Sequence, residues 1–191
     1  MSKSGVNILG IDPGLRNTGW GVIRLDGHRL NWIADGMIKP DPRASDETRL
    51  LEIETSMTTV LEKYQPHRAC IEEIFVAKNP ASALKLGMAR GAALVAVARF
   101  GLPLLTISAR RVKQNVTGSG RADKDQITAM VSRLLNVTPS GVDAADALAI
   151  AIAATNDQND HDNITSPRAA KGASSALDAA IQKALEKESQ S

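Results

Sequence analysis

The chain has 191 residues, 43% of them hydrophobic but only 3% aromatic, which allows one domain with a full core of aliphatic and alanine side chains. No apolar run approaches the roughly 20 residues that a membrane-spanning helix needs, and the N-terminus lacks a signal-peptide pattern, so we expect no membrane partner. The net charge is only +2, and the single cysteine, Cys70, excludes an internal disulfide and favours a cytoplasmic protein in which this side chain fills core space.

The first 40 residues predict a three-stranded antiparallel meander. An apolar run over residues 7–12 is followed by turn-forming residues and then by strands over residues 20–23 and 30–38. A helix over residues 46–64 keeps its apolar side chains on one face with the 3.6-residue period. A strand over residues 68–74 follows it.

The middle of the chain predicts a second helix rich in small residues. Asn79 is a suitable N-cap and Pro80 a suitable first helical residue for a helix that ends near Phe100. Because Ala and Gly gather on one of its faces, a partner can approach closely there. That partner is either the sheet or the same helix of a second subunit. A strand over residues 104–107 and a short helix over residues 109–116 come next.

The last core elements are two further helices. Asp123 and Gln126 have the spacing of a capping box, which predicts a helix start after a loop over residues 117–121 that we expect to be mobile. A final apolar helix covers residues 143–154. The whole pattern is typical of an α/β fold, a mixed sheet with helices on both faces.

The domain organisation follows from composition. Residues 1–156 predict a single folded domain. Residues 157–191 are rich in Asn, Asp, Ser and Ala at their start and predict a disordered C-terminal tail.

Four acidic residues lie in or beside apolar runs: Asp12, Glu72, Asp143 and Asp146. Taken singly, each has an ordinary explanation. Asp12 could form a turn, and Asp143 and Asp146 could cap the start of a helix, where the dipole favours anions. Glu72 and Glu73 alternate along a strand, so only one of the two can face a common site.

Together the four acids predict a metal site. A lone buried carboxylate costs several kcal/mol unless something compensates its charge. Divalent cations with oxygen ligands compensate such clusters, and two Mg²⁺ ions (or Mn²⁺) about 3.5–4 Å apart are suited to phosphodiester hydrolysis. The sequence therefore favours a metal-dependent enzyme.

The distribution of charge predicts the substrate class. Residues 74–142 carry 10 Lys and Arg against 2 Asp and Glu, a local excess of +8. This excess predicts a face that binds nucleic acid, since a solubilising surface usually mixes both signs. The candidate DNA contacts among the basic residues are Lys78, Lys85, Arg90, Arg110, Arg111 and Arg121.

Five segments, in order between about residues 7 and 155, match the motifs of one family. They are ILGIDPGLRNTGWGVI (8–23), IEEIF (71–75), AKNPASALKLGMARG (77–91), VKQNVTGSGRADK (112–124) and DAADALAIAI (143–152). These segments together resemble the RuvC family of Holliday junction resolvases, the crossover junction endodeoxyribonucleases of bacteria. The resemblance implies an RNase H-like fold with a five-stranded mixed sheet. It also implies a homodimer that nicks two opposing strands of four-way junction DNA during recombination and repair.

The resemblance also implies roles for individual residues. It places the four catalytic, metal-binding acids at Asp12, Glu72, Asp143 and Asp146, and so favours Glu72 over Glu73. Lys113 and Lys124 match basic residues expected near the scissile phosphate. Phe75 matches an aromatic expected to stack on a base at the junction centre. The implied partners are the branch-migration proteins RuvA and RuvB.

Two other functions remain open at this point. An actin-like ATPase or sugar kinase also begins with a hairpin of this kind, but it needs a second domain that 191 residues do not provide. A junction-binding protein without nuclease activity is the other alternative. A pure binder would gain from losing four negative charges beside DNA, so the intact acidic set argues against it.

Overall fold

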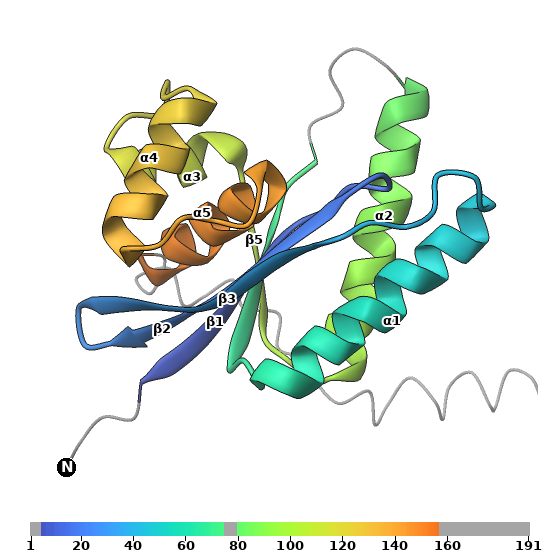
Figure 1. The fold of residues 1–191 in the computed structure, drawn as a ribbon, viewed down its shortest axis with the longest axis horizontal. Helices are drawn as coiled ribbons and strands as arrows, with labels where there is room; N and C mark the ends of the chain where they lie inside the picture. The colour runs from blue at the N-terminus through green and yellow to red at the C-terminus, as the bar shows by residue number, and fades with distance from the viewer. Residues whose placement is uncertain (1–4, 75–79, 157–191) are drawn as a thin grey trace, which may run out of the picture.

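The computed structural model describes residues 5–74 and 80–156, and within them one mixed sheet forms the centre of the molecule (Figure 1). The strand order is β3-β2-β1-β4-β5. The first three strands in the chain pair antiparallel, whereas β4 runs parallel to β1 and β5 runs parallel to β4. The strands are β1 (Val6–Asp12), β2 (Thr18–Asp26), β3 (Arg29–Ile38), β4 (Arg68–Glu72) and β5 (Leu104–Ile107).

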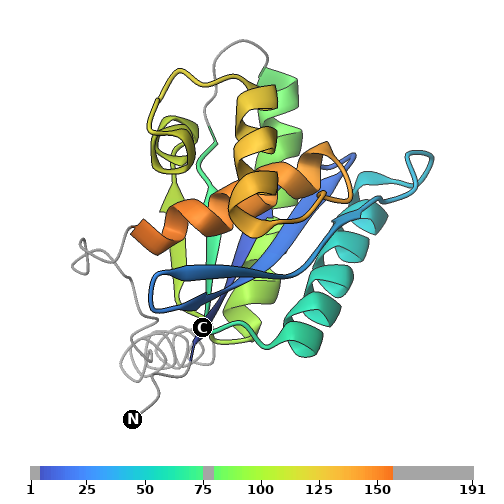
Figure 2. The same ribbon diagram turned by 60° about the vertical axis from the view of Figure 1, so that its left-hand side comes forward.

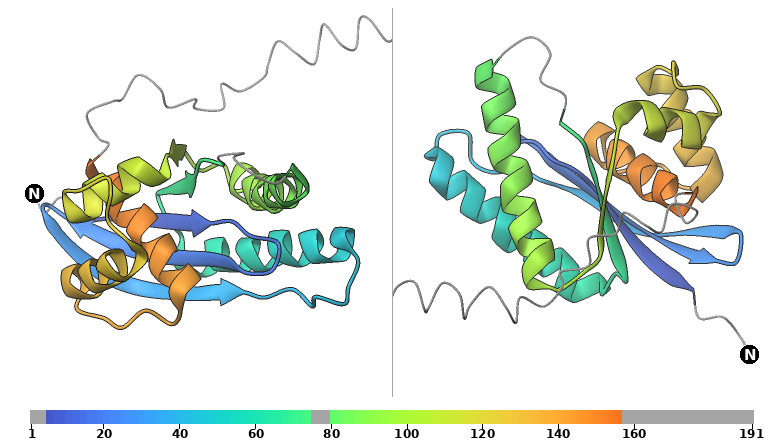
Figure 3. Two further views of the ribbon diagram at one scale, coloured as in Figure 1. Left: turned by 90° about the horizontal axis from the view of Figure 1, so that it is seen from above. Right: turned by 180° about the vertical axis from the view of Figure 1, so that it is seen from behind.

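Helices cover both faces of this sheet, as Figures 2 and 3 show from other sides. Helices α1 and α2 pack against each other on one face, and α3, α4 and α5 form a group on the other. The predicted α/β architecture is therefore confirmed. The helices are α1 (Asp46–Tyr64), α2 (Pro80–Arg99), α3 (Ala109–Thr117), α4 (Lys124–Leu135) and α5 (Val142–Asn156).

Strand β1 is apolar along most of its length because it is buried on both faces. Its side chains alternate between two cores. Ile8 lies in the core beneath α5, and Leu9 and Ile11 lie in the core beneath α1 and α2. This alternation decides which way the residue that follows Ile11 points.

Helix α5 lies unusually close to β1 and β2 because glycines face it. A Cβ atom on Gly10 would overlap the carbonyl oxygen of Ala147, and one on Gly19 would overlap the carbonyl oxygen of Asp143. Glycine at these positions lets the helix backbone touch the sheet. The first turn of α5 is thereby brought down to the end of β1.

Helix α2 has two apolar faces. Ala89, Ala93, Ala96 and Val97 are buried against the rest of the domain, whereas Leu84 and Val95 are 66% and 51% exposed. The sequence predicts no apolar run of membrane-spanning length. By length and composition alone, however, this helix is long and apolar enough to cross a membrane. The reason is that α2 is apolar on its outer face as well as on its inner face.

Several predicted element boundaries differ from the observed ones by one to three residues. The helix over residues 46–64 and the strand over residues 104–107 are confirmed. The strand predicted over residues 68–74 ends at Glu72, and the one predicted over residues 20–23 extends from Thr18 to Asp26. The Asn79 cap and the tail over residues 157–191 lie outside the described residues.

Candidate active site

Asp12 and Glu72 lie side by side at the ends of neighbouring strands. Ile11 of β1 is paired in parallel with Ile71 of β4, so the next residue of each strand is an acid at the same edge of the sheet. Cys70 belongs to the core beneath α5 and Ile71 to the opposite core. Because side chains alternate along a strand, Glu72 points to the α5 side. The neighbouring Glu73 is exposed.

Helix α5 supplies the other two acids from its first turns. Asp143 and Asp146 are three residues apart and share one helix face. Both are half-buried, and the Asp146 side chain is 21% exposed. The close contact of α5 with Gly19 carries this end of the helix to the end of β1. The fold therefore brings residues from three distant segments to one edge of the sheet.

Negative charge accumulates around Asp12. Burial, together with the charges of Glu72, Asp146 and Asp143, raises the pKa of Asp12 from 3.8 to about 7, although Lys124 acts to lower it. The pKa of Glu72 is also raised, first by burial and then by Asp146, against the opposing effect of Lys124 and Lys113. A second carboxylate within several ångströms favours the protonated form of its neighbour, so these carboxylates act on one another.

The acids are neighbours, but they do not yet form a metal cage. In residues 5–74 and 80–156, no three His, Cys, Asp or Glu side chains are grouped closely enough to hold an ion. Instead, the Lys124 Nζ donates to the Asp146 Oδ2 at 3.0 Å, and this contact raises the pKa of Lys124. Charge repulsion acts over longer distances than metal coordination, so both findings are compatible.

Two lysines lie on the same side of Asp12 as Glu72 and Asp146. Lys113 of α3 and Lys124 of α4 line a cleft of about 220 Å³ together with these three acids. Lys124 is the first residue of α4, directly after the N-cap Asp123, which forms a complete capping box with Gln126. The cap confirms the predicted helix start and fixes the origin of the Lys124 side chain.

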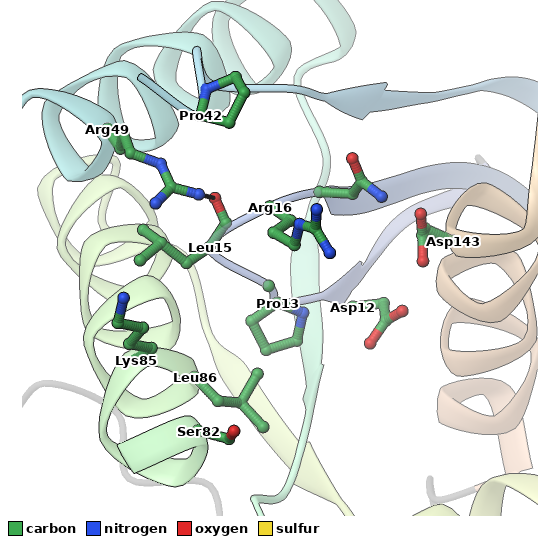
Figure 4. A pocket seen from close by; sticks show the side chains of 12 residues that line it. Asp12, Pro13, Leu15, Arg16, Pro42, Arg49, Ser82, Lys85, Leu86 and Asp143 are labelled. Carbon is green, nitrogen blue, oxygen red and sulfur yellow. Dashed lines mark hydrogen bonds between the residues drawn. The ribbon is translucent and has the colours of Figure 1, made fainter. Parts of the chain in front are cut away.

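A second cleft, of about 590 Å³, lies on the other side of Asp12 and includes Asp143 (Figure 4). Arg16, Arg49 and Lys85 also line it. The sequence alone gives no functional signal for Arg16. Arg49 could have been found, because it takes the place of an apolar residue on the buried face of α1, four residues before Ile53.

The predicted DNA contacts occupy different environments. Arg90 donates to the Glu72 carbonyl oxygen at 3.3 Å and to the Thr106 Oγ1 at 3.1 Å, so it ties α2 to the ends of β4 and β5. The remaining predicted contacts that the structure describes are exposed on α2, on α3 and in the loop before α4, namely Lys85, Arg110, Arg111 and Arg121. Phe75 and Lys78 lie outside the described residues.

Residues 8–154 match the model of one protein family, described as crossover junction endodeoxyribonuclease RuvC. The chain belongs to the RuvC family. RuvC of Maricaulis maris is 54% identical over 147 residues, which cover 77% of this chain and 89% of that protein. RuvC of Paramagnetospirillum magneticum is 49% identical over 148 residues, with the same coverage of 77% and 89%.

Solved structures agree with this RuvC assignment. The T. thermophilus RuvC in complex with a Holliday junction substrate is 32% identical, with a TM-score of 0.73 over 78% of this chain and 92% of that chain. The yeast mitochondrial Holliday junction resolvase Ydc2 is 14% identical, with a TM-score of 0.58 over 80% of each chain, and shows the fold alone. The predicted RNase H-like fold is confirmed, and RuvC-family membership identifies the chain as a metal-dependent endodeoxyribonuclease.

Proposed function

We propose that the chain resolves four-way DNA junctions by paired, symmetric nicks in opposing strands, as part of recombination and repair in the cytoplasm. The observation that carries the proposal is the site around Asp12. Half-buried carboxylates from β1, β4 and α5 gather there, next to two lysines in one cleft. The family match supports the same reaction, because its relatives are crossover junction endodeoxyribonucleases.

The acids fit divalent metal ions by their chemistry. Carboxylate oxygens are the hard ligands that Mg²⁺ and Mn²⁺ prefer, and the raised pKa of Asp12, caused first by burial and then by the neighbouring carboxylates, would be lowered by a bound cation. We propose that Asp12, Glu72, Asp143 and Asp146 hold two Mg²⁺ ions, or Mn²⁺ in their place. Bound ions would supply Lewis-acid activation of water and stabilisation of the leaving oxygen.

The two lysines have a different role in this proposal. Lys113 and Lys124 lie in the cleft where a phosphate beside Asp12 would sit. A phosphate oxygen can replace Asp146 as the partner of the Lys124 ammonium group, since both are anionic oxygen acceptors at hydrogen-bonding distance. The lysines then offset the negative charge that builds on the phosphorus during the displacement.

We propose that the outer face of α2 forms a homodimer interface. Leu84, Gly87, Gly91 and Val95 follow one another at helical spacing on the side opposite the buried alanines. A Cβ atom on Gly87 or Gly91 would meet nothing within 4 Å, so this stripe is open and nearly flat. A two-fold dimer places two active sites on a two-fold symmetric junction.

The remaining contacts belong to the same proposal. The basic residues of the middle of the chain, Lys78, Lys85, Arg110, Arg111 and Arg121, are expected to bind phosphates outside the active site. Phe75 is expected to stack on an unpaired base near the junction centre. Arg90 is expected to support Glu72 as well as to add positive charge. RuvA and RuvB are the expected protein partners.

A synthetic four-way junction with one labelled strand at a time tests the function. With Mg²⁺ the protein should produce nicks at symmetric positions in two opposing strands. A linear duplex of the same sequence is the control and should be cut far less. Tight junction binding without nicks, with Mg²⁺ or Mn²⁺, would contradict the nuclease proposal and support a protein that only binds junctions.

A further inference from the structure

Asp12 lies between two clefts rather than at the end of one. The cleft of about 220 Å³ leads away past Glu72 and Asp146, and the cleft of about 590 Å³ leads away past Asp143. A DNA strand whose scissile phosphate lies at Asp12 continues on both sides of that phosphate. The larger cleft is therefore available to the next part of the strand.

Arg16 places an uncommitted positive charge in this larger cleft. It follows Leu15 in the loop between β1 and β2, and its side chain is exposed. Across the described ranges 5–74 and 80–156 it forms no ion pair. In Figure 4 it lies between Leu15 and the side of the cleft that carries Asp12 and Asp143. A guanidinium group that lines the same cleft as two carboxylates, yet is paired with neither, is free to bind a phosphate.

The loop that carries Arg16 is held rigidly. The buried Thr18 hydroxyl donates to the Gly14 carbonyl oxygen at 2.8 Å and accepts from the Gly14 N–H at 3.3 Å. The Arg49 guanidinium, which is only 7% exposed, donates to the Leu15 carbonyl oxygen at 2.9 Å. These bonds fix the backbone on both sides of Arg16, so less freedom is lost when its side chain binds a ligand.

A second cation faces the same cleft from another element. Lys85 extends from α2 (Figure 4), and its contact with Asp46 is long, at 3.9 Å, between side chains that are 57% and 40% exposed. Such an exposed pair holds its partners weakly. Lys85 can therefore turn from Asp46 to a phosphate oxygen. The cleft thus offers two cationic groups from different elements beside the acids of the active site.

We propose that the cleft lined by Arg16 and Lys85 is a phosphate subsite for the DNA backbone next to the scissile phosphate, on the Asp143 side. This inference rests on the proposed function. Arg16 binds the phosphate through its planar fork of N–H donors, and Lys85 adds a second, more mobile charge. Arg49 is a positioning residue that acts through the loop. The ligand is a phosphodiester, with one charge per phosphate, because the nearby carboxylates disfavour ions of higher charge.

The test combines a protein change with a change in the DNA. Arg16→Gln is compared with Arg29→Gln, which removes the same charge from an exposed arginine at the start of β3. Junctions carry one neutral methylphosphonate at each phosphate flanking the cut in turn. For the unaltered protein, the modification at one flanking position should slow nicking roughly tenfold, the size expected for one charge-assisted contact.

Arg16→Gln should slow nicking of unmodified DNA by a similar factor and should lose no further rate at that flanking position. Arg29→Gln should keep the full sensitivity. The subsite would be overturned if the rate losses from Arg16→Gln and from the methylphosphonate multiplied at both flanking positions. Unchanged nicking by Arg16→Gln would overturn it as well. Junction binding with Ca²⁺ in place of Mg²⁺ gives a readout that needs no cleavage. There Arg16→Gln should lower the slope of log affinity against log salt by about one, and Arg29→Gln should not. If the unaltered protein binds junctions but never nicks them, the proposed nuclease function is refuted. The salt dependence of binding still tests the phosphate subsite in that case.

Discussion

Replacing Asp12 with Asn should stabilise the metal-free protein at neutral and alkaline pH. In the folded chain the pKa of this carboxyl is about 7, against 3.8 for an ordinary Asp, because of burial and the charges of Glu72, Asp146 and Asp143. Between these two values the folded state keeps a proton that the unfolded state has released. The free energy of unfolding therefore falls as pH rises through this window, and the loss is complete above pH 7.

The size of the effect follows from the same values. A pKa raised from 3.8 to about 7, at about 1.4 kcal/mol per pH unit, costs the folded protein about 4 kcal/mol once Asp12 is ionised in both states. Asp12 is only half-buried, so part of this cost is relieved by water. We expect Asp12→Asn to recover about 2–4 kcal/mol at pH 8, which for a domain of this size is roughly 4–16 °C in Tm. At pH 4 the gain should nearly vanish.

The assay is thermal unfolding with EDTA at pH 4, 6 and 8. Glu73→Gln is the matched control, because Glu73 is the exposed neighbour of Glu72 and its replacement should change Tm little at any pH. In a second series Mg²⁺ should raise the Tm of the unaltered protein and of the control, but much less that of Asp12→Asn. Equal stability of Asp12→Asn and the unaltered protein at pH 8, or an equal gain at pH 4, would show that the pKa of Asp12 is not raised in the folded protein.

Three further changes test other parts of the structure. Asp146→Asn should abolish nicking. Junction affinity measured by gel shift should be equal or higher, because a charge that repels DNA is lost and Lys124 is released from its ion pair. Loss of binding would contradict this expectation. Light scattering should show the proposed dimer for the unaltered protein and a monomer for Gly87→Trp, whereas Trp at the exposed Ala129 of α4 should leave the dimer intact. A dimer of Gly87→Trp would exclude α2 as the interface. Gly10→Ala should lower the free energy of unfolding, measured in urea, by about 1–3 kcal/mol, because the new Cβ atom would overlap the backbone of α5. An unchanged free energy of unfolding would show that α5 can shift to make room.

Elements with their own local signals could be predicted from the sequence closely. The Asp123–Gln126 capping box is present as predicted, and α1 begins and ends at the predicted residues. The ends of strands are harder to predict from sequence, because they depend on where the neighbouring strand stops pairing. Strand β4 stops at Glu72 because its last partner in β5 is Ile107, although apolar alternation continues to Ile74.

The start of β2 illustrates the opposite error. Thr18 and Gly19 are ordinary turn residues, and their sequence pattern predicts a turn. In the structure Gly19 pairs with Asp12, so the strand reaches further toward the loop. Glycine is needed there for the approach of α5, not for a turn. Such a requirement depends on tertiary packing and leaves no mark in local periodicity.

The candidate site could be predicted only in part for a similar reason. Asp12 and Glu72 each follow an apolar strand, so their meeting at one sheet edge could be expected. A count of charges could not separate Arg90, which binds the Glu72 carbonyl oxygen and Thr106, from basic residues that face solvent. A count of charges also does not identify Arg16, because the proposed function of this side chain depends on the cleft that α1 and α2 complete.

The charge balance of the site explains why cation binding and DNA binding should depend on each other. Once all four carboxylates are ionised, they and the two lysines of the smaller cleft leave a surplus of two negative charges beside Asp12, and a scissile phosphate would add another. In the proposed site, a strand without divalent ions would be repelled from the place where it must react, although Arg16 and Lys85 would attract its neighbouring phosphate. The four carboxylates would repel the strand less with divalent ions bound, and a phosphate would in turn offer its oxygens as further ligands. The coupling is reciprocal by thermodynamic necessity, so DNA should raise the affinity for divalent ions by the factor by which the ions raise the affinity for DNA.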